Sequence, residues 1–113
     1  MILYRPVGEA ELNLIKESLY SAFPPRLPEQ PIFYPVLNEQ YASEIAGKWN
    51  TKHSKSGKKG YVTRFEIDDE YISQFEVQTV GAHYHQELWI PAEDLTEFNI
   101  HIKGNIEVIA SFE

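Results

Sequence analysis

The stretch YVTRFEI, residues 61–67, alternates apolar and polar side chains with the two-residue period of a β-strand. Asp68 follows it and can cap a short helical turn that runs to Phe75. Before this strand the apolar residues recur mostly at helical spacing, and after it they form mostly short strands. This order favours an α+β domain with a mixed sheet and disfavours a doubly wound parallel fold.

The part of the chain before residue 61 predicts two helices, each preceded by a short strand. Residues 2–7 predict a first strand that carries Arg5, and residues 9–20 predict a helix. Residues 32–34 predict a second strand. A second helix is expected from Asn38, which can act as its cap, to about Asn50. Its apolar face is predicted to contain Tyr41, Ile45 and Trp49, with Ala42 and Ala46 alongside.

The part after residue 68 predicts further strands. Residues 77–80 form one, and residues 85–90 form another that ends at Pro91, because proline cannot donate to a ladder of hydrogen bonds. A last short helix is expected to end at Gly104, and residues 106–112 predict a final strand.

The size and composition of the chain are those of one small domain. Its 113 residues, 42% of them hydrophobic, predict a single domain over residues 1–113. The chain has no cysteine and a net charge of −7, so we expect neither disulfides nor a nucleic-acid or membrane partner. It contains no signal peptide or long apolar run, which predicts a cytoplasmic protein.

Two loops have a distinctive composition. Residues 23–31 contain four prolines and predict an extended loop, which either walls a pocket or docks on a protein partner. Residues 51–60 are polar, and the cations within 52–59 stand out against the acidic remainder. We interpret this basic loop as solvated surface, with a phosphate or partner contact as the alternative.

Three polar residues lie on predicted strands among apolar neighbours: Arg5 on the first, Tyr34 on the second and Glu87 on a late one. This order resembles the ADP-ribosyltransferase superfamily, which places an Arg or His, a Ser or Tyr, and a Glu on the corresponding strands. The resemblance implies a small mixed or antiparallel split sheet with two to three helices. The chain also resembles short bacterial proteins labelled ADP-ribosylation/crystallin, through its Tyr-Arg-Pro-Val opening and its Phe-Pro-Pro-Arg-Leu-Pro segment.

The transferase resemblance implies NAD as a dinucleotide substrate and no metal cofactor. Glu87 would be the catalytic residue, since a carboxylate beside the ribose stabilises the positive charge that builds up as nicotinamide leaves. Arg5 would hold ribose or phosphate oxygens, and Tyr34 or Tyr41 would stack on the nicotinamide ring. In transferases that modify arginine, the residue two before the catalytic Glu is usually Glu or Gln. Here that residue is His85, which disfavours arginine as the acceptor of ADP-ribose.

Two alternatives come from other features of the sequence. His83, His85 and Glu87 occupy alternate positions, and two imidazoles with a carboxylate are a common set of transition-metal ligands. The segment Phe23-Pro24-Pro25-Arg26-Leu27-Pro28 is rigid and apolar, which suits a non-catalytic protein-interaction domain.

Overall fold

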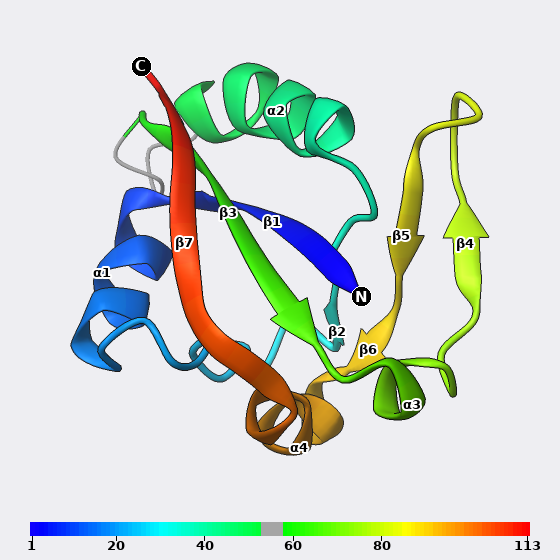
Figure 1. Cartoon of the computed structure of the whole chain (residues 1–113). Coiled ribbons are helices and arrows are strands. Elements are labelled where there is room, and N and C mark those ends of the chain that lie inside the picture. Colours follow the sequence, from blue (N-terminus) through cyan, green and yellow to red (C-terminus); the bar gives the residue numbers. More distant parts are fainter. Residues whose placement is uncertain (53–57) are drawn as a thin grey trace.

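The strand predicted at residues 61–67 is the middle strand of the main sheet in the computed structural model, which describes residues 1–52 and 58–113. Strand β3 (Gly60–Ile67) pairs antiparallel with β1 (Ile2–Gly8) on one side and with β7 (Ile102–Phe112) on the other. The strands cross the molecule between α2 and α4, as Figure 1 shows. The predicted α+β class is confirmed, and the described strand pairs are antiparallel.

A second ladder splits away from the main sheet. Strand β2 (Ile32–Phe33) pairs with β6 (Ile90–Pro91), and Val36 continues the same register by pairing with Glu87. Strand β5 (Gln86–Leu88) also pairs with β4 (Val77–Thr79). Val36 forms a single bridge to Tyr4, which attaches this ladder to β1. This bridge is therefore the point at which the backbone of the second ladder pairs with β1.

Two of the helices, α2 and α3, begin at a side chain that caps them. The Asn38 side chain accepts a hydrogen bond from the Tyr41 amide at 2.8 Å, and Asp68 accepts one from the Tyr71 amide at 2.9 Å, so both predicted caps are confirmed. The described residues form four α-helices, where two to three were expected, because the helical turn predicted after Asp68 forms a short helix. They are α1 (Glu9–Glu17), α2 (Glu39–Lys48), α3 (Asp69–Ile72) and α4 (Leu95–Ile100), with short 3-10 turns at Asn50–Lys52 and Ala92–Asp94.

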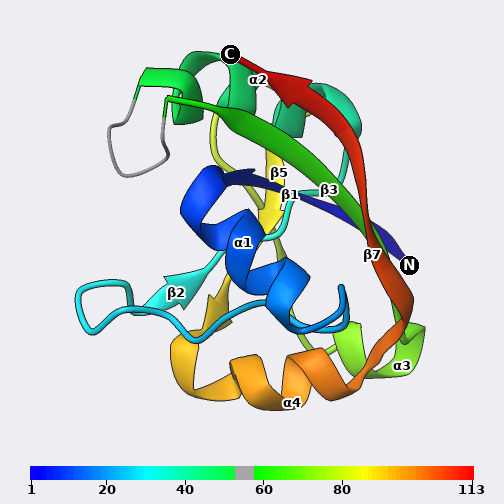
Figure 2. The same ribbon diagram turned by 90° about the vertical axis from the view of Figure 1, so that its left-hand side faces the viewer.

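The main sheet separates two cores of different size. Its larger core contains four mutually packed phenylalanine rings, Phe23, Phe33, Phe65 and Phe98, and is covered by α1 and α4. Figure 2, turned by 90°, shows α1 in front of the strands and α4 below them. The smaller core lies under α2, and Ala42 and Ala46 are fully buried there.

Helix α2 packs on the sheet differently from the prediction. A Cβ atom at Gly60 would lie 2.2 Å from the carbonyl oxygen of Ala46, so the helix backbone approaches β3 closely. The small side chains Ala42 and Ala46 therefore face the sheet, while Trp49 is 65% exposed. The prediction that Trp49 belongs to the buried face was wrong, because so close a contact leaves no room for an indole ring.

Two predicted boundaries also differ from the structure. Pro91 lies within β6, opposite Ile32, instead of ending the strand before it. The last helix ends before Ile102, and Gly104 lies inside β7 with a φ of +73°. The pairing of β7 with β3 shifts register at this place, between Arg64 and Glu66. Gly104 therefore belongs to a β-bulge, where glycine tolerates the left-handed backbone, and the prediction that it ends the last helix was wrong.

Candidate functional site

A cleft of about 800 Å³ opens where the second ladder separates from β1. The Tyr4 amide donates to the Val36 carbonyl at 2.9 Å, and the Val36 amide donates to the Tyr4 carbonyl at 2.8 Å. Beyond this bridge, the segment from Arg5 to Gly8 stays paired with β3, and it lines the cleft together with Tyr34. The cleft is thus a consequence of the split in the sheet.

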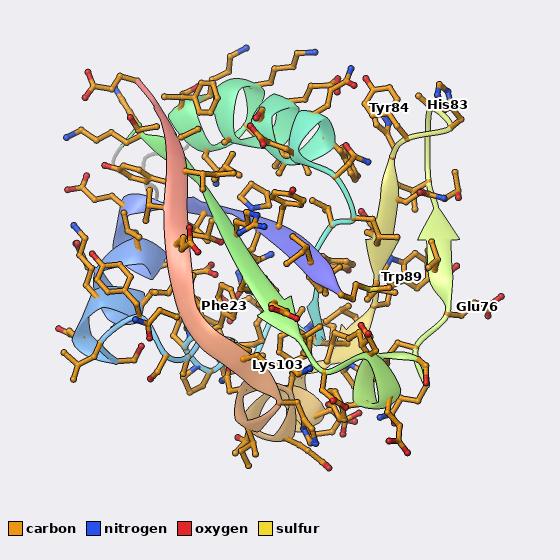
Figure 3. All side chains as sticks on the ribbon, in the orientation of Figure 1. Phe23, Glu76, His83, Tyr84, Trp89 and Lys103 are labelled. Atoms are coloured by element: carbon orange, nitrogen blue, oxygen red, sulfur yellow. The ribbon has the colours of Figure 1, made fainter. Side chains whose placement is uncertain are left out.

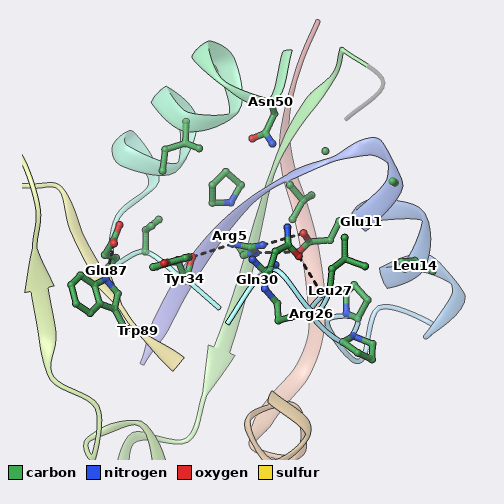
Figure 4. Close-up of a pocket in the computed structure, with 18 residues that line it drawn as sticks. Arg5, Glu11, Leu14, Arg26, Leu27, Gln30, Tyr34, Asn50, Glu87 and Trp89 are labelled. Atoms are coloured by element: carbon green, nitrogen blue, oxygen red, sulfur yellow. Dashed lines mark hydrogen bonds and ion pairs between the residues drawn. The ribbon is translucent and has the colours of Figure 1, made fainter. Parts of the chain in front are cut away.

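The close-up in Figure 4 shows that the cleft has two differently charged ends. We call the part around Arg5, Glu11 and Arg26 the loop end, because the proline-rich loop lines it. We call the part around Glu87 and Trp89 the strand end, because Glu87 lies in β5 and Trp89 lies between β5 and β6. Apolar side chains between the two ends complete the lining, which is usual for small-molecule sites.

At the loop end, Arg5 is held in a fixed position. Its Nε and Nη2 atoms donate to the two carboxylate oxygens of Glu11 at 3.1 and 3.0 Å, which is a bidentate ion pair. Its Nη1 atom donates to the Tyr34 carbonyl at 3.3 Å, and its Cζ atom lies 4.7 Å from the centroid of the Phe33 ring. Arg5 is only 9% exposed. Three of its five N–H groups are therefore used within the protein.

The proline-rich loop brings a second arginine to the same end. Pro24, Pro25 and Leu27 line the cleft beside Arg26. The Nε atom of Arg26 is shielded from solvent and has no hydrogen-bond partner in the described ranges. Burial lowers the pKa of Arg26, and the positive charge of Arg5 lowers it further. The loop thus walls the cleft, as one of the two sequence interpretations had it.

At the strand end, Glu87 is held by two donors. The Tyr41 hydroxyl donates to its Oε2 atom at 2.9 Å, and the Trp89 indole donates to its Oε1 atom at 2.7 Å. Glu87 itself is half-buried. Burial, assisted by the hydrogen bond to Glu87, raises the pKa of Tyr41 to about 12, so its hydroxyl stays a donor at neutral pH.

The structure brings the four predicted site residues together in two ways. Arg5, Tyr34 and Glu87 line the cleft directly, although they come from three distant segments. Tyr41 contacts the cleft through its hydrogen bond to Glu87, and its ring stacks on His85 with centroids 4.5 Å apart. Tyr34 is 40% exposed, so of the two tyrosines predicted to stack on a ligand it has the freer ring.

Three further residues complete the site without having been predicted as part of it. Glu11 lies in the first turn of α1, where an acid is explained by the helix dipole alone, and Arg26 lies in the segment that the sequence predicts to be a rigid loop. Trp89 is two residues after Glu87 in the predicted strand 85–90, and this two-residue spacing is the signal in the sequence for their hydrogen bond. Side chains from separate elements meet here, and spacing along the chain does not report such contacts.

The metal alternative finds no support in the positions of its residues. His83 is exposed at the turn between β4 and β5, where Figure 3 labels it beside Tyr84. The Nδ1 atom of His85 accepts from the Ala82 amide at 3.1 Å, and its Nε2 atom lies 3.8 Å from Glu44. Residues 1–52 and 58–113 contain no group of three His, Cys, Asp or Glu side chains that could hold a metal ion.

Residues 53–57 of the basic loop lie outside the described residues. The part of the basic-loop prediction that concerns Lys55 and its neighbours therefore falls outside them too.

No helix in the described part of the chain is long and apolar enough to cross a membrane. No family model matches the chain, and no curated protein or solved structure matches it either. The resemblance to ADP-ribosyltransferases stays a prediction.

Proposed function

We propose that the cleft binds a nucleotide, with NAD as the first candidate. One observation carries this proposal: Arg5, Tyr34 and Glu87, which come from three distant segments, line one cleft of about 800 Å³. That volume is within the usual range of small-molecule sites. A nucleotide has an anionic part, flat rings and sugar hydroxyls, and the cleft offers arginines, exposed aromatic rings and a carboxylate.

The strand end suits the ribose of such a ligand. The hydrogen bonds from Tyr41 and Trp89 each occupy one lone pair of a Glu87 oxygen, so each oxygen can accept another donor. A ribose hydroxyl would be that donor. The rings of Tyr34 and Trp89 are 40% and 44% exposed, which leaves surface for stacking against a base or a nicotinamide ring.

This arrangement supports the breaking of the bond between ribose and nicotinamide as the reaction. The ribose carbon becomes positively charged as nicotinamide leaves with the electron pair, and the carboxylate of Glu87 would stabilise that charge. Attack by water would make the protein an NAD glycohydrolase, and attack by another acceptor would make it an ADP-ribosyltransferase. The alternative in which the proline-rich loop docks on a protein stays a prediction.

Calorimetry with NAD tests the binding, and chromatography of released nicotinamide tests the reaction. We expect saturable binding by the natural protein, and loss of nicotinamide release in Glu87→Gln, which keeps the shape of the side chain but removes its charge. Glu76→Gln is the matched control, because Glu76 is exposed at the foot of the β4–β5 ribbon (Figure 3) and does not line the cleft.

Two results would contradict the proposal. One is the absence of binding at millimolar NAD. The other is equal nicotinamide release by Glu87→Gln and Glu76→Gln, which would show that Glu87 does not act on the ribose.

A further inference from the structure

The loop end of the cleft carries more positive than negative charge. Arg5 and Arg26 both lie there, and the carboxylate that faces them is that of Glu11. Both oxygens of Glu11 accept from Arg5, which leaves this carboxylate committed to one of the two arginines. No ion pair is formed by Arg26 within residues 1–52 and 58–113. An unpaired cation in a cleft is unexpected in a chain of net charge −7.

The surroundings of Arg26 are unfavourable for a cation as they stand. Its Nε atom is shielded from solvent without a partner among the described residues, and a buried donor without a hydrogen bond destabilises the protein. Its Cζ atom lies 6.0 Å from the centroid of the Phe33 ring, against which Arg5 also packs. The two guanidinium groups thus share one aromatic ring, and their charges repel. A bound anion would relieve both penalties.

We infer that Arg26 binds the anionic group of the ligand, and that this group is a phosphate. This inference rests on the proposed function for the choice of a nucleotide. Arg26 replaces Arg5 as the main anion contact, because Arg5 already spends three N–H groups on Glu11 and Tyr34. Arg5 still has two N–H groups to offer, and it keeps its role in positioning the loop end.

The choice of phosphate over carboxylate follows from the number of donors at this end. Arg26 offers its guanidinium fork, Arg5 offers its remaining N–H groups, and Gly8 and Ala10 bring the start of α1 to the cleft lining. The several tetrahedral oxygens of a phosphate can reach donors on more than one side, whereas a carboxylate has two oxygens in a plane. Glu87 repels anions from the strand end, so the ligand would bind in one orientation.

Titrations with inorganic pyrophosphate and with NAD test this inference. Nuclear magnetic resonance of the arginine Nε–H groups of the natural protein should show a saturable shift of the Arg26 signal with pyrophosphate, and a smaller one with acetate. In calorimetry, Arg26→Gln should weaken NAD binding at least tenfold. Arg64→Gln is the matched control, since it removes the same charge from a partly exposed position outside the cleft lining, and it should bind NAD as the natural protein does.

The outcomes separate the two proposals. If NAD binds equally well to Arg26→Gln and to the natural protein, the inference is overturned while nucleotide binding stands. If pyrophosphate shifts the Arg26 signal but NAD does not bind, the phosphate site stands and the choice of NAD fails. If pyrophosphate leaves the Arg26 signal unmoved, or moves it no more than acetate does, the inference is overturned. The resonance measurement needs no variant, so a misfolded Arg26→Gln would not prevent this decision.

Discussion

Arg5 at the loop end and Glu87 at the strand end are both charged, both hydrogen-bonded and both part of the cleft lining. They differ in what their partners leave accessible. Arg5 is 9% exposed and meets a carboxylate that takes two of its N–H groups, so it joins β1 to α1. Glu87 is half-buried and is held by two neutral donors, which orient the carboxylate without cancelling its charge.

This difference teaches how to read a charged residue that lines a cleft. A charge that is paired and buried on all sides contributes to the fold, since removing one partner leaves the other uncompensated in a poor solvent for ions. A charge that neutral groups hold in place remains available to a ligand. Both residues were predicted as parts of one site, and their partners assign them to different tasks.

The largest effect is expected from breaking the pair at the loop end. The side chains of Arg5 and Glu11 are 11% and 20% exposed, so Glu11→Ala would leave a nearly buried guanidinium without its carboxylate. We expect the free energy of unfolding, measured by urea denaturation, to fall by about 3 kcal/mol. Glu9→Ala removes an acid from the same turn of α1 and should cost less than about 1 kcal/mol. Equal losses in the two variants would show that the ion pair adds nothing to the helix-end effect.

The titration of Tyr41 tests the hydrogen bond that holds Glu87 at the strand end. Its pKa of about 12 lies above the value of 10.0 for a free tyrosine, so the folded protein holds this proton more tightly than the unfolded chain does. Its contribution to stability is complete below pH 10 and is lost as the pH rises toward 12. We expect resonance spectra of ring-labelled tyrosines, assigned with Tyr41→Phe, to show this late titration.

The variant Glu87→Gln separates the causes of that shift. Removing the carboxylate charge should lower the pKa of Tyr41, but the value should stay above 10 because burial, the larger cause, remains. If Tyr41 ionised together with freely exposed tyrosines in the natural protein, neither its burial nor its hydrogen bond to Glu87 would be as described.

The smallest effect is expected from an exposed ion pair on the main sheet. Arg64 and Glu107 lie 3.8 Å apart on β3 and β7, and their side chains are 39% and 62% exposed. Water screens such pairs, so Glu107→Gln should change the free energy of unfolding by less than about 0.5 kcal/mol in the same urea experiment. If Glu107→Gln lowered the free energy of unfolding as much as Glu11→Ala does, burial would not explain why one ion pair stabilises the protein more than the other.

Sequence patterns predicted a structural element correctly where that element depends only on residues close together in the chain. The caps Asn38 and Asp68 and the alternating strand at residues 61–67 depend on nearest neighbours, and the structure confirms all three. Trp49 and Gly104 were misplaced, because the first depends on how closely α2 approaches β3 and the second on a register shift between two strands. The spacing of apolar residues in the sequence indicates neither the distance between a helix and a strand nor the register of two paired strands.

The sequence by itself determined the helices, the strands and the chemical groups available to a site, since these follow from the preferences of single residues and their near neighbours. The tertiary structure alone decided that Glu11 neutralises Arg5, that the Nε atom of Arg26 has no hydrogen-bond partner among the described residues, and that Tyr41 orients Glu87. The physical reason is that a charge acts through its surroundings. Those surroundings come from segments that meet only once the sheet has split and the loop has packed over the opening.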